Sequence, residues 1–254
     1  MKHIPTLLKR ELSAYFFGPM AFLILLAFQA IAWINFWQLL DRLVTNPSFL
    51  SGLRDPLNFY ISQSITFWIA LMVALPALTM RLLSEETRSG TIETLLTVPV
   101  TETEIVLAKW IAGVVMYLML LVPFAIYLPF LYFQGNYHFD VGPFYSIAIG
   151  MTTLGMMFIA IGLFFSALTK NQIVAAIWTF ATMFLFIFLA EVGYNYAIVK
   201  GASWAELMRF LSIFYQVYTF GLGQLDLRFI TVHLSICAFM LFLTIKVVQW
   251  RRAG

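Results

Sequence analysis

Residues 105–133 read IVLAKWIAGVVMYLMLLVPFAIYLPFLYF, and the only charged side chain in this stretch is Lys109. A helix needs about 20 mostly apolar residues to cross a bilayer, so this stretch alone predicts a membrane-spanning helix. Apolar runs of the same kind recur along the chain. The six predicted spans are residues 20–40, 57–80, 105–133, 144–168, 172–190 and 229–249. The sequence therefore predicts an all-α membrane protein whose residues 1–254 form a single transmembrane domain.

The composition agrees with this fold class. Apolar residues make up 62% of the 254 residues and charged residues 11%, against roughly 45–50% and about 25% in a typical soluble domain. The formal net charge of +3 is too small and too scattered for a nucleic-acid-binding surface. The single cysteine, Cys237, excludes an intrachain disulfide. The motif Ala30-Ile31-Ala32 is similar to a signal-peptide cleavage site, but the apolar run continues to Leu40, so we expect a retained first span.

The basic residues predict how the chain is oriented in the membrane. Six spans put both termini on one side, and cytosolic loops carry an excess of Lys and Arg. With cytosolic termini, ten basic residues lie at the inner ends of the spans: Lys2, Lys9, Arg10, Arg81, Arg88, Lys109, Lys170, Lys246, Arg251 and Arg252. Five lie at the outer ends: Arg42, Arg54, Lys200, Arg209 and Arg228. This ratio favours cytosolic termini.

Residues 1–17 have the pattern of an amphipathic helix at the membrane surface. Six apolar side chains recur at helical spacing: Ile4, Leu7, Leu8, Leu12, Tyr15 and Phe16. We expect Gly18-Pro19 to end this helix. Glu11 falls near the apolar stripe, where it can pair with Arg10 or with a neighbouring helix. A solvated tail is the alternative.

The predicted spans contain few ionisable groups. We expect Lys109 and Lys246 to reach the inner interface from the span ends, and His233 lies near the outer end of the last span. Buried ionisable residues normally mark proton or ion paths, so their scarcity argues against a proton-coupled carrier, a voltage sensor or an intramembrane protease. The chain has no phosphate-binding loop and no metal-ligand spacing, which predicts no cofactor in this chain.

Two sets of residues within the spans have more than one interpretation. Five polar residues could line a transport path or form helix–helix hydrogen bonds: Gln29, Asn35, Gln38, Thr66 and Thr179. Ala148, Gly155 and Gly162 lie seven residues apart on span four and allow another helix to approach closely. That helix could belong to this chain or to a second copy.

The loop RLLSEETRSGTIETLLTVPVTETE, residues 81–104, predicts a folded element and not a slack connection. It contains five of the twelve acidic residues: Glu85, Glu86, Glu93, Glu102 and Glu104. We expect Ser84 to cap a short helix that Ser89-Gly90 ends. Ile92, Leu95 and Leu96 then give a second helix an apolar face until Pro99, and Thr101 with Glu104 forms a capping box for span three. The alternative is a loop that only packs under its own spans.

Within this loop, the string EETRSGTIETLL at residues 85–96 resembles the signature of ABC-2 type transporter permeases. The resemblance continues through Pro99, Glu104-Ile105-Val106 and Lys109. Other segments similar to that family are Lys9-Arg10-Glu11-Leu12, Tyr15-Phe16, Pro19 and Phe165–Gln172. The segment from Phe220 through Gly223, Leu225 and Asp226 to Phe229, with Trp250-Arg251-Arg252, is most similar to the subgroup associated with gliding motility and copper-enzyme maturation.

The resemblance implies the non-catalytic membrane half of an ATP-driven exporter in a bacterial plasma membrane. Two permease copies, or two related chains, would each dock a cytosolic ABC ATPase, and that partner would bind ATP and Mg²⁺. The 81–104 loop would seat in the ATPase and move spans one, two and five. The implied coupling residues are Glu85, Glu86, Arg88, Gly90, Thr91, Ile92, Glu93, Leu95 and Leu96.

The resemblance also implies short re-entrant helices within residues 191–228, at the outer face. Membrane lipid would be a further partner of the chain.

Two other functions stay open from the sequence. One is a gradient-driven channel or secondary carrier, and the other is a scaffold that recruits an ATPase but transports nothing.

Overall fold

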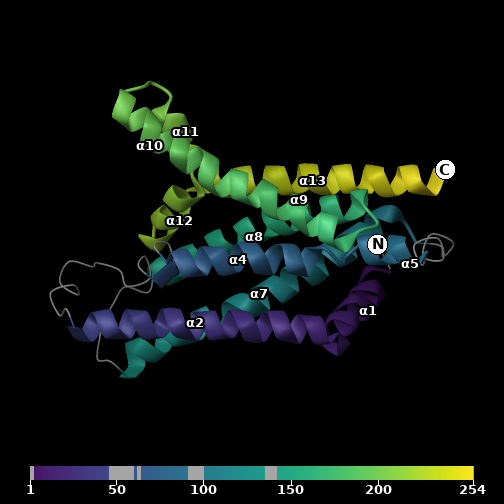
Figure 1. Cartoon of the computed structure of the whole chain (residues 1–254), viewed down its shortest axis with the longest axis horizontal. Coiled ribbons are helices and arrows are strands. Elements are labelled where there is room, and N and C mark those ends of the chain that lie inside the picture. Colours follow the sequence, from purple (N-terminus) through teal and green to yellow (C-terminus); the bar gives the residue numbers. More distant parts are fainter. Residues whose placement is uncertain (1–2, 46–59, 62–63, 91–99, 135–141, 254) are drawn as a thin grey trace.

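The computed structural model describes residues 3–45, 60–61, 64–90, 100–134 and 142–253 (Figure 1). Within these residues, six helices are long and apolar enough to cross a membrane, which confirms the six predicted spans. They cover Pro19–Arg42, Ile65–Ser89, Glu102–Tyr127, Gly142–Leu168, Gln172–Lys200 and Leu227–Arg252. The chain is therefore a multi-pass, all-helical membrane protein.

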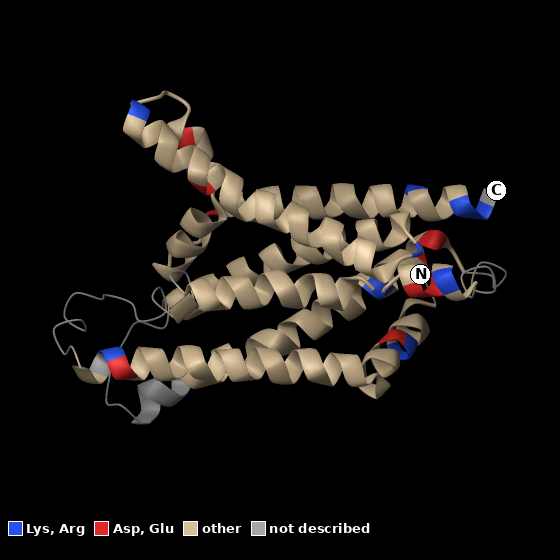
Figure 2. Cartoon of the chain, viewed as in Figure 1, with Lys and Arg blue, Asp and Glu red and all other residues tan. Residues whose placement is uncertain are grey.

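The long helices run side by side along the molecule, and both termini lie at the same end of the bundle (Figure 1). The helices are α1 (Ile4–Phe17), α2 (Pro19–Thr45), α4 (Ile65–Thr79), α5 (Ser84–Ser89), α7 (Glu102–Gln134), α8 (Gly142–Leu168), α9 (Gln172–Phe184), α10 (Ala190–Lys200), α11 (Ala205–Leu211), α12 (Ile213–Gly221) and α13 (Leu227–Ala253). We name the end with both termini the terminal end and the opposite end the distal end. Figure 2 shows the acidic and basic residues gathered toward these two ends.

Span five extends further than its sequence predicts. The predicted boundary was residue 190, but a π-helical turn, Leu185–Leu189, joins α9 to α10, and the helix continues to Lys200. The polar residues of α10 lower the hydropathy without breaking the helix. The break comes at Gly201, which has a left-handed φ of 62°. Within the predicted outer segment, the separate short helices are α11 and α12.

The helix α8 forms the centre of the bundle because its glycines let three other helices approach closely. A Cβ at Gly150 would lie 2.2 Å from the Phe220 ring on α12, and one at Gly162 would lie 2.2 Å from Thr79 on α4. Gly155 faces Tyr117 on α7. The small-residue stripe therefore packs inside this chain at Gly155 and Gly162, whereas its third member, Ala148, is exposed.

Candidate functional site

The site begins at the turn between α4 and α5, at the terminal end. The helix α5 carries Glu85 and Glu86 in its first turn, and as predicted it ends at Ser89-Gly90, where Gly90 is left-handed with φ 73°. The prediction for Ser84 is wrong. Ser84 is fully buried inside the first turn, and its hydroxyl donates to the carbonyl oxygen of Met80 instead of capping the helix. Leu82 and Leu83, which precede Ser84, are buried in an apolar cluster, so the start of α5 faces the interior of the protein.

Ser166 on α8 holds this turn in place. Its hydroxyl oxygen accepts hydrogen bonds from the backbone N–H groups of Leu83 and Ser84, both at 3.0 Å. The same hydroxyl donates to the carbonyl of Met80 at 3.0 Å. Ser166 is fully buried, so water does not replace it as a partner. One side chain thus fixes the start of α5 to the centre of the bundle.

We predict that Ser166→Ala lowers the free energy of unfolding by about 2 kcal/mol, because two buried N–H groups lose their acceptor. Thermal unfolding in detergent measures the change. Thr179→Val is the matched control, since Thr179 is equally buried but donates only to Ala175 of its own helix. It should cost less than about 1 kcal/mol. Equal losses in both variants would contradict the anchoring role of Ser166.

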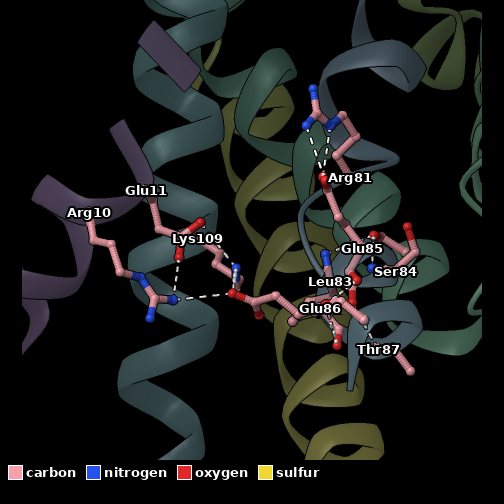
Figure 3. Close-up of polar contacts among 11 residues, drawn as sticks. Arg10, Glu11, Arg81, Leu83, Ser84, Glu85, Glu86, Thr87 and Lys109 are labelled. Carbon is pink, nitrogen blue, oxygen red and sulfur yellow. Dashed lines mark hydrogen bonds and ion pairs between the residues drawn. The ribbon is translucent and has the colours of Figure 1, made fainter. Parts of the chain in front are cut away.

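Two acidic and two basic side chains form a closed ion network beside this turn (Figure 3). Lys109 Nζ lies 3.1 Å from Glu11 Oε2 and 2.9 Å from Glu86 Oε1. Arg10 Nη2 lies 2.9 Å from Glu11 Oε1 and 3.1 Å from Glu86 Oε1. Each cation therefore contacts both carboxylates, and the network joins α1, α5 and α7.

The position of Lys109 corrects the expectation that it extends to the interface. Its side chain is only 2% exposed, and it points into the protein. Glu11, which interrupts the apolar stripe of α1, is the one buried residue among those described in that helix. The sequence alternatives for Glu11 are both realised, since it pairs with Arg10 and with a neighbouring helix. Removing one member of a buried pair costs more than the pair contributes, so these residues depend on each other.

A cavity of about 320 Å³ lies against the network, between α1 and α5. A second ion pair, Arg81 with Glu85 at 2.8 Å, lines the same cavity. Tyr15 closes another part of it and donates a hydrogen bond to the carbonyl of Leu78 at 2.9 Å. Burial raises the pKa of Tyr15, so its hydroxyl stays protonated and remains a donor. The helix α1 is thus attached to α4 as well as to α5 and α7.

The end of α13 contacts the same loop from another direction. Arg251 Nη1 donates to the Thr87 hydroxyl at 2.7 Å, and Arg252 Nη1 lies 2.5 Å from Glu102 Oε1. Thr87 belongs to α5, and Glu102 begins α7. The sequence predicts neither contact, because it gives the two arginines meaning only for the membrane orientation and for the family resemblance. The one available signal was a basic pair directly after an apolar span.

The predicted coupling residues lie at the terminal end as far as the structure describes them. Glu85, Glu86, Arg88 and Gly90 belong to α5 and its C-terminal cap. The remaining predicted coupling residues, Thr91, Ile92, Glu93, Leu95 and Leu96, lie outside the described residues. The capping box after them is confirmed: the Glu104 carboxylate accepts from the Thr101 N–H at 3.2 Å, and the Glu104 N–H donates to the Thr101 hydroxyl at 3.3 Å.

Three of the five predicted path residues form hydrogen bonds between helices in the part of the chain that the structure describes. Gln29 donates to the Tyr127 hydroxyl and so joins α2 to α7. Asn35 accepts a hydrogen bond from Thr66 at 2.6 Å and joins α2 to α4. The remaining two predicted path residues have no shared partner among the described contacts: Thr179 bonds within its own helix, and Gln38 is exposed on α2.

The terminal-end site consists of ion pairs and helix ends. Such an arrangement suits a mechanical contact with another protein better than catalysis. Among the residues that the structure describes, no group of three or more His, Cys, Asp or Glu side chains could hold a metal ion.

No curated protein matches the chain. Residues 13–245 match the model of the ABC-2 family transporter proteins. This match covers nearly the whole chain, including Glu86 and Lys109 of the ion network but not Arg10 and Glu11. The chain therefore belongs to the ABC-2 transporter family, whose members are membrane-spanning permease components of ABC transporters.

Proposed function

We propose that the chain is the permease subunit of an ATP-driven exporter, powered by a separate cytosolic ABC ATPase. The observation that supports this most directly is the ion network of Arg10, Glu11, Glu86 and Lys109, in which Lys109 is buried and Arg10 is half exposed. It connects the loop that would receive an ATPase to two other helices. A force on α5 would therefore reach α1 and α7 together, and α1 continues directly into span one through Gly18.

The proposed orientation places the terminal end in the cytosol. The excess of basic residues at that end supports it under the positive-inside rule. The helix α1 lies obliquely across this end (Figure 1), and its Phe16 and Phe17 side chains are 37% and 89% exposed. Exposed aromatic side chains on an amphipathic helix suit the headgroup region of the inner leaflet. We propose a bacterial plasma membrane as the location.

The assembly follows from the same proposal. Two permease chains, identical or related, would each dock one ATPase, which binds ATP and Mg²⁺ outside this chain. The absence of a cofactor in this chain and the subgroup resemblance remain predictions. The proposed docking element is α5 with the segment that follows Gly90.

Glu86 is not a suitable residue for testing docking alone. It contacts both Lys109 and Arg10, so its replacement disturbs the fold as well as any ATPase contact. A substitution at Gly90 distinguishes better between an effect on ATPase docking and an effect on the fold. Gly90 has a left-handed φ of 73°, and an added Cβ there meets nothing within 4 Å. A substitution at Gly90 therefore changes the backbone preference of the loop without a clash.

We predict that Gly90→Ala weakens binding of the ATPase several-fold, because a non-glycine residue in the left-handed region is disfavoured by about 1–2 kcal/mol. The variant loop would leave the conformation from which the docking segment starts. Gly201→Ala is the matched control, since Gly201 has φ 62° and equally open surroundings at the far end of α10. Binding of the co-purified ATPase to the permease in nanodiscs measures the effect.

Both variants should lose similar thermal stability, but only Gly90→Ala should lose ATPase affinity and ATPase stimulation. Equal ATPase binding by the two variants would refute docking at this loop. Failure of any ABC ATPase to co-purify with the wild-type chain would refute the proposed function itself.

A further inference from the structure

The helix α13 touches functional elements at both ends of the molecule. It runs as one continuous helix of 27 residues from Leu227 to Ala253. Such a helix is about 40 Å long at 1.5 Å per residue. Its sequence contains no proline or glycine between those residues, so nothing in it favours a kink. A displacement at one end is therefore carried to the other.

At the terminal end, α13 and α8 hold consecutive parts of the same loop. Arg251 on α13 contacts Thr87, and Ser166 on α8 holds Leu83 and Ser84. Arg252 adds the contact with Glu102 on α7. The two helices also pack on each other within the membrane, where the Cys237 thiol lies 3.5 Å from the carbonyl of Met156. Movement of α5 would displace α8 and α13 together.

At the distal end, α13 holds α12 through a buried polar group. His233 is 2% exposed, and its Nε2 lies 2.8 Å from Gln216 Oε1 on α12. Its Nδ1 lies 3.1 Å from the Thr153 hydroxyl on α8. Gln216 also donates to the carbonyl of Phe210 at the end of α11, at 2.9 Å. One histidine thus connects the pair α8 and α13 to both short distal helices.

Aromatic packing strengthens this distal connection. The Phe229 ring of α13 lies 5.2 Å from the Phe210 ring and 5.9 Å from the Phe220 ring, measured between centroids. Phe220 also fills the space that Gly150 leaves on α8. Displacement of α13 along or about its axis would therefore shift α12 directly.

We infer that α13, together with α8, transmits movement from the loop at α5 to the distal helices α11 and α12, with Arg251, Arg252 and His233 as positioning residues. This inference rests on the proposed function, because it needs an ATPase that moves the loop. It adds a route through span six, whereas the family resemblance implies movement of spans one, two and five.

The test compares hydrogen–deuterium exchange of two segments in the permease–ATPase complex, with and without a non-hydrolysable ATP analogue and Mg²⁺. The first segment is α5, residues 84–89, and the second is α11 with α12, residues 205–221. In wild type, the nucleotide should change exchange in both segments. In Arg251→Gln/Arg252→Gln, the change at α5 should persist while the change at residues 205–221 falls at least threefold.

A conservative variant separates positioning from a general loss of structure. Arg251→Lys/Arg252→Lys keeps a donor for Thr87 and a cation for Glu102, so it should restore most of the distal response. Undiminished distal exchange changes in the glutamine variant would overturn the route through α13. A wild-type complex without any nucleotide-dependent change at α5 would instead refute the proposed function.

Distal variants test the role of His233 in the same complex. His233→Leu leaves the side-chain oxygen of Gln216 without its partner and should lower both stability and the distal response. Gln216→Leu/His233→Leu removes both polar groups, so it should recover part of the stability, although the carbonyl of Phe210 then loses the Gln216 donor. If the distal response recovers together with stability, His233 is only structural and the inference is wrong. If stability alone recovers, the inference is supported.

Discussion

Lys109→Met should abolish ATPase stimulation and lower the free energy of unfolding by about 3–5 kcal/mol, the usual cost of removing one partner from a buried ion pair. The substitution keeps the apolar length of the side chain and removes the charge. It leaves the Glu11 and Glu86 carboxylates close together, with Arg10 as their remaining cation in the network. The two carboxylates share Lys109 in the wild type and repel each other without it, so α1 and α5 should separate. Thermal unfolding and ATPase assays of the assembled complex measure the two effects.

Two further variants distinguish charge from packing at Lys109. Lys109→Arg keeps the cation, and the adjoining cavity of about 320 Å³ gives the larger side chain room, so it should retain most stability and stimulation. Glu11→Gln/Glu86→Gln/Lys109→Met removes the like charges and should recover stability while stimulation stays low. Full stimulation in Lys109→Met would contradict the role of the network in coupling.

The sequence predicted the helices well because a membrane span is a local property. About 20 apolar residues suffice whatever surrounds them, and the capping box of Thr101 and Glu104 lies within four consecutive residues. The predicted end of span five, residue 190, is too early because hydropathy is also a local property and does not report where a helix ends. Hydropathy falls at Glu191, but the backbone stays helical until Gly201 removes the steric limit on φ. In this part of span five, a fall in hydropathy does not mark the end of the helix.

The ion network could be anticipated only in part. Glu11 and Lys109 were visible as exceptions, each a charge within an apolar pattern, but they are 98 residues apart in sequence. Their pairing depends on the angle at which α1 returns across the bundle. Arg251 and Thr87 are 164 residues apart in sequence. Neither is a charge within an apolar pattern, so the sequence does not indicate their contact. A charge at a helix end looks the same whether it meets solvent or a partner.

Burial also determines which serine and which histidine hold neighbouring helices together. The sequence predicts a cap at Ser84 and no hydrogen-bonding role for Ser166, yet Ser166 holds the turn. His233 was placed near the outer end of a span, and the structure shows it fully enclosed between α8 and α12. Residue type and spacing do not report which side of a helix is covered. That information comes only from the packing of all six spans.

Gly155→Ala should lower the free energy of unfolding by about 2 kcal/mol or more, although alanine is the better helix former by about 1 kcal/mol. The new Cβ would lie 2.0 Å from the ring of Tyr117, which is fully buried. The ring cannot move aside easily, because its hydroxyl donates to the carbonyl of Met151 at 2.8 Å. For a chain of this size the melting temperature should fall by roughly 5 °C.

A graded series of glycine substitutions tests whether close packing on α8 sets this cost. Gly113→Ala is the milder variant for comparison, because its Cβ would lie 2.9 Å from the Cγ2 methyl of Ile159, whereas at Gly155 the distance to the Tyr117 ring is 2.0 Å. It should lose far less stability than Gly155→Ala. Gly155→Ala/Tyr117→Leu should recover part of the loss, because leucine removes the ring but also the hydrogen bond to Met151. An unchanged stability of Gly155→Ala would mean that α7 and α8 can separate at little cost. The central position of α8 would then not hold the bundle together.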